Sequence, residues 1–142
     1  MLFRSAEEVQ REVRDLSIKV ADTALPVSSL SGGNQQKVVI GKALMTAPKV
    51  LLMDEPSRGI DIGAKGDVFR IMRSLAAQGI GILFVTSDLD EVLALSDRIA
   101  VMSQGRLTAL FDRADATEAK IVAASSIGHG PAVAPQRKGL SA

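Results

Sequence analysis

Apolar residues form two short continuous runs in the middle of the chain. One run is Val50–Met53, where no polar position interrupts the large side chains, and the other lies within residues 80–86. A run without alternation is typical of a strand that is covered on both faces, as in the centre of a parallel sheet. The pattern therefore predicts two buried strands, at 50–54 and 80–86, in a mostly parallel sheet.

Helices are predicted around these strands. A capping box at residues 5–8 opens a surface helix. Two further helices are expected after Ser31 and after Asp61, the second of which ends at Gly79. A last helix is expected to begin within residues 115–118. Apolar positions that recur at helical spacing in these segments are Val9, Val13, Leu16, Val38, Leu44, Met45, Val68, Ile71, Met72, Leu75, Ala76, Ile121 and Val122.

The remaining segments are predicted to be a loop, a hairpin and a tail. Residues 23–29 contain Pro26 and lack periodicity, which favours a loop. The segments 98–103 and 106–111 alternate around Gln104-Gly105, which is typical of a β-hairpin. Residues 125–142 are rich in Gly, Pro, Ala and Ser, and we expect them to be a disordered tail.

Composition excludes several classes of function. The chain has a net charge of +1 and only 3% aromatic residues, so neither a basic stripe nor a base-stacking surface is predicted, and no nucleic-acid partner is expected. It contains no cysteine, which excludes disulfides, thiol catalysis and cysteine zinc sites. No segment has the pattern of a secretory signal or a membrane span, so membrane association is expected only through a partner.

Two acidic residues, Asp54 and Glu55, follow the first predicted strand and precede Pro56. Proline cannot continue a central strand, so the chain must turn where the acids lie. Ligands of open α/β sheets bind at this end of the strands, because loops and helix N-termini converge there. The pair is thus a candidate site, although a solvated loop after a core strand would have the same sequence.

The start of the second predicted helix, Ser31-Gly32-Gly33, is a candidate anion site. It would combine free backbone N–H groups, the positive end of the helix dipole, a hydroxyl group and glycines that allow close approach. The structural alternative is a serine N-cap followed by flexible glycines. Asp61 has a similar ambiguity, because it can simply cap the next helix.

Taken together, these motifs resemble the second half of an ATP-binding cassette (ABC) ATPase. The resemblance rests on residues 30–37, the acid pair Asp54-Glu55, and residues 85–88, in that order and spacing. It implies that the signature motif contacts the γ-phosphate of ATP held by the opposite cassette, that Asp54 holds Mg²⁺, and that Glu55 activates the attacking water. It further implies that Gly59-Ile60-Asp61 is the D-loop between cassettes and that Ser87 is a degenerate switch residue in place of histidine. The residues implied to bind the cofactor ATP are Ser31, Gly32, Gly33, Asn34 and Gln35 of the signature motif and Asp61 of the D-loop.

The match is narrower than a general cassette. Residues 30–39 and 54–65 look like the second cassette of the double-cassette ATPases of bacterial monosaccharide importers of the ribose, galactose and xylose type. The implied fold is α/β, a partial P-loop NTPase fold with a mostly parallel sheet, flanking helices and a C-terminal β-hairpin. Residues 1–29 would be the end of the helical subdomain and a linker, and residues 30–124 would be the signature, Walker B and switch part.

The phosphate-binding Walker A loop is missing from this sequence. Gly41-Lys42 is followed by Ala43 where serine or threonine is needed, and the segment 59–65 has Ala64 where glycine is needed. We therefore expect the isolated chain to bind ATP weakly and to hydrolyse little or none. In this interpretation the chain is a fragment or split subunit that supplies its signature motif in trans.

The resemblance also implies partners and a location. They are a second ABC cassette that supplies Walker A, a transmembrane permease and, indirectly, a periplasmic sugar-binding protein. The chain would be cytoplasmic and peripheral on the inner face of the plasma membrane. Two alternatives stay open: an inactive remnant without catalysis, and a soluble ABC ATPase of DNA maintenance or translation, although the coiled-coil heptads or basic patches expected of the latter are absent.

Overall fold

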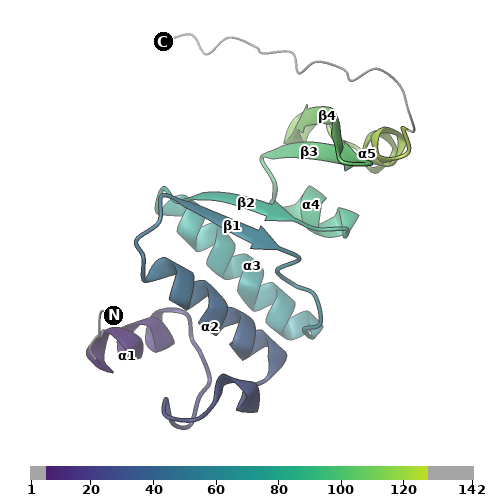
Figure 1. Cartoon of the computed structure of the whole chain (residues 1–142). Coiled ribbons are helices and arrows are strands. Elements are labelled where there is room, and N and C mark those ends of the chain that lie inside the picture. The colour runs from purple at the N-terminus through teal and green to yellow at the C-terminus, as the bar shows by residue number, and fades with distance from the viewer. Residues whose placement is uncertain (1–5, 128–142) are drawn as a thin grey trace. The chain divides into compact units, whose positions relative to one another are not determined.

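The computed structural model describes residues 6–127, which form two compact units that meet in sequence between Thr86 and Ser87 (Figure 1). The first unit contains α1 (Ala6–Asp15), the 3-10 turn η1 (Val27–Ser29), α2 (Gly32–Leu44), β1 (Val50–Asp54), α3 (Ile62–Ala77) and β2 (Gly81–Val85). The second contains α4 (Leu89–Leu95), β3 (Arg98–Ser103), β4 (Arg106–Asp112), the 3-10 turn η2 (Arg113–Asp115) and α5 (Glu118–Ser125).

The first unit is built on a parallel pair of strands, β1 and β2, which α3 connects. The register places Leu52 opposite Leu83 and Asp54 opposite Val85. Figure 1 shows α2 and α3 side by side on one side of this strand pair. The predicted parallel strands and their flanking helices are therefore confirmed.

The prediction that both strands are buried on both faces is wrong for the described residues. In β1, Leu51 and Met53 are buried, whereas Val50 and Leu52 are exposed. The strand β2 alternates in the same way, with Leu83 exposed. The reason is that α2 and α3 cover one face only, so alternate side chains of each strand point to a bare face.

The covered face forms the core of the first unit. Apolar side chains from both strands and the helices meet there, and the buried ones are Leu16, Ile18, Ile40, Leu51, Met53, Val68, Met72 and Leu75. The end of α3 agrees with the prediction, because Gly79 has a φ of 89° and its N–H bonds to Ala76 O at 3.0 Å, while Ile80 N bonds to Leu75 O at 3.2 Å. This pair of bonds is a Schellman motif, which needs a left-handed residue at the position of Gly79.

The second unit packs a β-hairpin against helices. The predicted hairpin is confirmed as antiparallel β3 and β4, and its turn residues Gln104 and Gly105 have φ angles of 48° and 75°, as a type I′ turn requires. Its core consists of Ile99, Val101, Ala116, Ile121 and Ala124.

Some details of the predicted elements differ in the structure. The expected loop at residues 23–29 contains η1, and α4 was not predicted. In α5, Ile121 points inward as expected, but Val122 is exposed and Ala124 takes the second inward position. Ser125 still belongs to α5, whereas Ser5 and residues 128–142, including His129, lie outside the described residues. Among the helices between residues 6 and 127, none is long and apolar enough to cross a membrane.

Candidate functional site

The acid pair lies at the carboxyl end of the strand pair, as predicted. Asp54 is the last residue of β1 and is exposed, and Pro56 two residues later is buried. The N–H of Glu55 donates to Val85 O at 2.8 Å, so pairing to β2 continues one residue past the strand. The backbone of both acids is thereby fixed at the rim of the sheet.

Glu55 has a strained backbone at this rim. Its φ is 44°, in the left-handed region that a large side chain rarely adopts. The turn holds it there, because the N–H of Arg58 donates to Glu55 O at 3.0 Å. Non-glycine residues in this region persist where the surroundings fix them, and they cluster at functional sites. The conformation therefore marks Glu55 as a functional candidate by a signal that is absent from the sequence.

Thr86 is a neighbour of Glu55 that sequence reasoning missed. Its hydroxyl donates to Glu55 Oε2 at 3.4 Å from the end of the adjacent strand. The sequence contained a signal for this contact, because Glu55 follows the first predicted strand, Thr86 ends the second, and the carboxyl ends of parallel strands meet at one edge of a sheet. We regard Thr86 as a residue that positions the carboxylate.

Ser31 is exposed at the N-cap position of α2. Contrary to the expectation for a serine cap, its side chain makes no capping hydrogen bond to the first turn. Its hydroxyl instead accepts from Asn34 Nδ2 at 3.0 Å. The helix start thus keeps its backbone donors free of a serine cap, which is the arrangement that an anion site uses.

Asn34 and Gln35 brace the segment before α2. Asn34 Oδ1 accepts from the N–H of Lys19 at 2.9 Å, and Gln35 Nε2 donates to Leu30 O at 2.8 Å. Both the oxygen and the nitrogen of the Asn34 side-chain amide therefore form hydrogen bonds within the protein. These bonds fix the position of Ser31 relative to the helix.

Gly32 and Gly33 bring α2 close to the segment before α3. A Cβ on Gly33, which is buried, would lie 2.3 Å from the Cβ of Ala64, and one on Gly32 would lie 3.3 Å from Gly59 O. No side chain fits at Gly33 without a shift of the backbone. The structure therefore places Gly32 beside Gly59 and Ile60, and Gly33 beside Ala64.

Asp61 caps α3, because its Oδ1 accepts from the N–H of Ala64 at 3.0 Å. We expect Asp61→Ala to lower the free energy of unfolding of the first unit by about 1 kcal/mol, since the first turn loses its cap. Asp61→Ser keeps a capping oxygen and should recover most of that loss. Urea denaturation followed by circular dichroism measures both, and equal stability of the alanine variant and the native chain would contradict the role as a cap.

The carboxylate oxygens at the rim of the sheet could hold Mg²⁺ only together with phosphate oxygens of a bound ligand. Among residues 6–127 no group of three or more acidic or histidine side chains is arranged to hold a metal ion. Mg²⁺ needs no such group, because it is commonly held by one or two carboxylates together with phosphate oxygens and waters. Asp54 can therefore be its protein ligand. Ser87 is exposed and begins the second unit.

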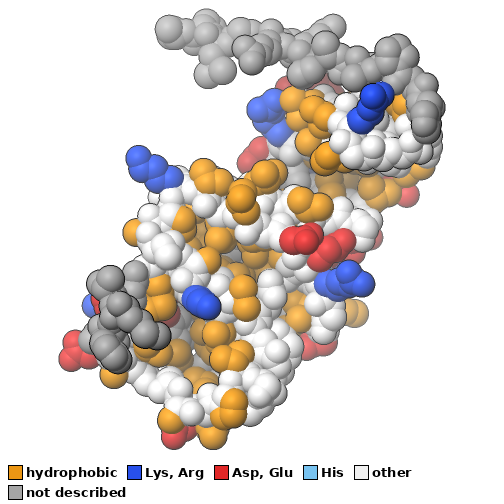
Figure 2. Space-filling view, viewed as in Figure 1, with side chains coloured by type: hydrophobic (Ala, Val, Ile, Leu, Met, Phe, Trp, Pro, Cys, Tyr) orange, Lys and Arg blue, Asp and Glu red, His pale blue; other side chains and the backbone are white. Residues whose placement is uncertain are grey.

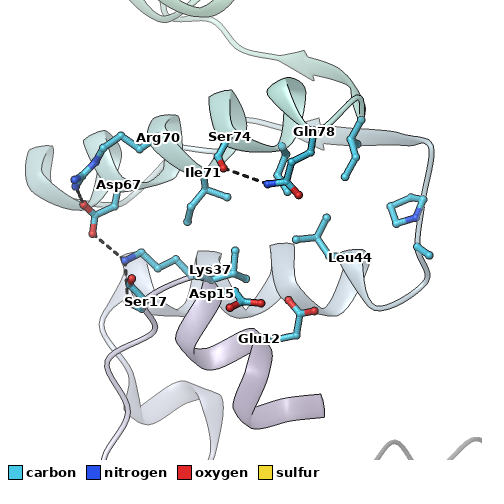
Figure 3. Close-up of a pocket in the computed structure, with 15 residues that line it drawn as sticks. Glu12, Asp15, Ser17, Lys37, Leu44, Asp67, Arg70, Ile71, Ser74 and Gln78 are labelled. Carbon is cyan, nitrogen blue, oxygen red and sulfur yellow. Dashed lines mark hydrogen bonds and ion pairs between the residues drawn. The ribbon is translucent and has the colours of Figure 1, made fainter. Parts of the chain in front are cut away.

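A separate cleft of about 670 Å³ lies between α1, α2 and α3 (Figure 3). At one end the buried Lys37 donates to Asp67 Oδ2 at 2.8 Å and to Ser17 O at 3.2 Å, and Arg70 also contacts Asp67. The hydrogen bond from Lys37 holds the pKa of Asp67 below its ordinary value, although partial burial opposes this. This ion pair joins α2 to α3 and was not predicted from the sequence.

The chain is similar in sequence to known transporter subunits. Residues 4–58 match the family model described as ABC transporter. The xylose import ATP-binding protein XylG of Moorella thermoacetica is 52% identical over 130 residues, which are 90% of this chain and 26% of that protein. The ribose import ATP-binding protein RbsA 1 of Streptomyces coelicolor is 54% identical over 111 residues, which are 78% of this chain and 22% of that protein.

Solved structures show the same likeness. A nucleotide-free ATP-binding cassette of an ABC transporter superposes with a TM-score of 0.69 at 33% identity, over 78% of this chain and 44% of that one. The ADP conformation of another such cassette gives a TM-score of 0.70 at 31% identity, over 87% of this chain and 52% of that one. The chain thus spans about a quarter of the length of the curated relatives it matches and about half of each of these two solved cassettes, and by sequence and fold it is similar to part of an ATP-binding cassette of an ABC transporter.

Proposed function

We propose that the chain supplies the signature and Walker B surfaces of an ATPase that energises a carbohydrate importer. The observation that carries the proposal is the exposed Ser31 at a helix start that has no side-chain cap and is flanked by close-packed glycines. The sugar class follows from the xylose and ribose importers to which the chain is similar. The sequence further favours the second cassette of such a subunit.

In this proposal the residues around Ser31 and the acid pair Asp54-Glu55 act on two different ATP molecules. Ser31 and the first-turn amides of α2 would donate to the γ-phosphate of ATP that another cassette holds with its Walker A loop. Asp54 would hold Mg²⁺ and Glu55 would orient the attacking water for the nucleotide of its own cassette. Ser87 would make the shorter contact expected at the switch position. Magnesium neutralises charge on the phosphates when it is bound.

The proposal also places the chain at a membrane through other proteins. A permease would bind the cassette on the cytoplasmic side, and a periplasmic sugar-binding protein would deliver the substrate to that permease. The names of the related subunits support this arrangement, because each is an import ATP-binding protein.

A chimera tests the proposed role of Ser31. We would place this chain in the XylG protein of Moorella thermoacetica, in exchange for the stretch that it matches, and measure ATP hydrolysis. Ser31→Arg should lower the rate about a hundredfold, because it removes a donor to the transferred phosphate and fills the approach to the helix start. Ser28→Arg is the matched control, since Ser28 is also an exposed serine but lies in η1, and it should leave the rate unchanged.

Two results would count against the proposal. An active chimera whose rate is the same with Ser31→Arg would show that the signature motif takes no part in hydrolysis. A chimera that folds and assembles but is inactive before any substitution would favour the inactive remnant.

A further inference from the structure

The side-chain amide of Asn34 links the segment after α1 to Ser31. Asn34 Oδ1 accepts from the N–H of Lys19 at 2.9 Å, and Asn34 Nδ2 donates to Ser31 Oγ at 3.0 Å. A backbone N–H can only donate, so the amide atom that faces Lys19 must be the oxygen. The end of the amide that faces Ser31 is therefore the NH₂ group.

This orientation decides where the hydroxyl hydrogen of Ser31 can point. An amide NH₂ group has two donors and no acceptor, so the Ser31 hydroxyl accepts from Asn34 and cannot donate to it. Within residues 6–127 the structure gives this hydroxyl no other hydrogen-bond partner. Ser31 is exposed, and Figure 2 shows a surface at this end of α2 that is mostly backbone and uncharged polar side chains. The hydrogen is thus available to a ligand.

The segment that holds Asn34 is itself fixed against α2. Lys37 Nζ donates to Ser17 O at 3.2 Å (Figure 3), and the N–H of Ile18 donates to Val13 O at 2.8 Å. The side chain of Ile18 is buried in the core of the first unit. The N–H of Lys19, the next residue, is therefore presented from a fixed turn. A fixed donor keeps the amide in one orientation, which a mobile loop would not do.

We propose that Asn34 is a positioning residue that makes the Ser31 hydroxyl a hydrogen-bond donor to the γ-phosphate, and that Asn34 itself does not bind the nucleotide. Each end of its amide already bonds within the protein, so its effect reaches ATP through Ser31. A donor that is oriented before the phosphate arrives needs no reorganisation during the reaction. The inference rests on the proposed function, because it explains how the same site presents its donor. It replaces the direct contact with ATP that the sequence resemblance implies for Asn34.

A double-mutant cycle in the XylG chimera tests this assignment. Ser31→Ala should lower kcat for ATP hydrolysis about a hundredfold, because a donor to the transferred phosphate is lost. Asn34→Ala should lower kcat about tenfold and leave KM for ATP unchanged, since the hydroxyl is present but no longer oriented. The double variant should be no slower than Ser31→Ala, because Asn34 acts only through that hydroxyl.

Asn34→Asp tests the direction of the hydroxyl hydrogen. The carboxylate still accepts from the N–H of Lys19, but it presents an acceptor oxygen to Ser31, so the hydroxyl should donate to the carboxylate instead of the phosphate. We expect kcat to fall to that of Ser31→Ala. Ser31→Ala combined with Asn34→Asp should be no slower than Ser31→Ala alone. A further loss would mean that the new charge acts on the phosphate directly, which would overturn the inference.

Gln78→Ala is the matched control. Gln78 Nε2 also donates to a serine hydroxyl, Ser74 Oγ at 3.3 Å, but it lies at the opposite end of α3 from Asp61. Removal of this amide should leave kcat unchanged, because it is remote from the proposed site. A loss equal to that of Asn34→Ala would show that truncation of any such amide slows the chimera, and the assignment of Asn34 would be wrong.

The remaining outcomes separate this inference from the proposed function. Independent effects of Asn34→Ala and Ser31→Ala, about a thousandfold together, would show that Asn34 contacts the nucleotide itself. A raised KM for Asn34→Ala would show the same, and either result overturns the inference. So would an unchanged kcat for Asn34→Ala when Ser31→Ala is slow. If Ser31→Ala left kcat unchanged, the role of the signature motif in the proposed function would fail as well.

Discussion

Gly33→Ala should lower the free energy of unfolding of the first unit by about 3 kcal/mol, and Gly33→Val by more. The reason is steric, because the added Cβ would lie 2.3 Å from that of Ala64, and overpacking at a rigid helix contact typically costs about 1–3 kcal/mol. Both atoms belong to the first turns of helices, Gly33 in α2 and Ala64 in α3. Urea denaturation of the full chain, followed by circular dichroism, measures the loss.

Two variants identify the cause of this loss. Gly33→Ala combined with Ala64→Gly moves the Cβ from one helix to the other and should recover most of the stability, because the number of helical glycines is then the same as in the native chain. Gly66→Ala is the control, because Gly66 lies in α3 where an added Cβ would meet no neighbouring element within 4 Å, and it should be neutral or stabilising. Failure of the double variant to recover would show that Gly33 is needed for a reason other than its contact with Ala64.

The parts of the fold that depend on local sequence could be predicted. The strand at 50–54, the end of α3 at Gly79 and the turn at Gln104-Gly105 each follow from a pattern within a few residues. The acid pair could be placed at the rim of the sheet for the same reason, since the apolar run ends at Asp54.

The rest depends on contacts between distant segments. An apolar run predicts that a strand is covered on both faces, and it cannot show that residues 6–127 cover one face only. The left-handed φ of Glu55 and the close approach of Gly33 to Ala64 are set by tertiary packing. Lys37 is one of several polar residues in the sequence of α2, and only its position against α3 makes it a buried ion-pair partner.

Asp67→Ala should destabilise the first unit by about 3 kcal/mol, because it leaves the ammonium group of the buried Lys37 without its carboxylate. The remaining acceptor within reach is Ser17 O at 3.2 Å. Arg70→Ala is the control, because its exposed guanidinium contacts the other oxygen of Asp67, and exposed ion pairs contribute about 0–1 kcal/mol. If both variants were equally stable, the pair between Lys37 and Asp67 would not join α2 to α3.

A variant without either charge distinguishes the contribution of the ion pair from the cost of leaving one buried charge unpaired. Lys37→Met together with Asp67→Ala should recover most of the stability, because a buried ion pair is often replaced by apolar residues without net loss. Lys37→Met alone should cost less than Asp67→Ala, since the carboxylate left behind is partly exposed and retains Arg70.

Acid should weaken the same contact in the native chain. The pKa of Asp67 is lowered in the folded state by the hydrogen bond from Lys37, so the folded chain binds this proton less readily than the unfolded chain. The stabilisation is therefore complete above the ordinary aspartate pKa of 3.8 and is lost as the pH falls below that value towards the lowered pKa. Between about pH 6 and pH 3 the stability of Asp67→Asn should fall less steeply than that of the native chain, which urea denaturation at each pH measures. Parallel curves for the two proteins would mean that the carboxylate of Asp67 is equally acidic in the folded and unfolded states, and that the ion pair with Lys37 adds nothing to the stability of the first unit.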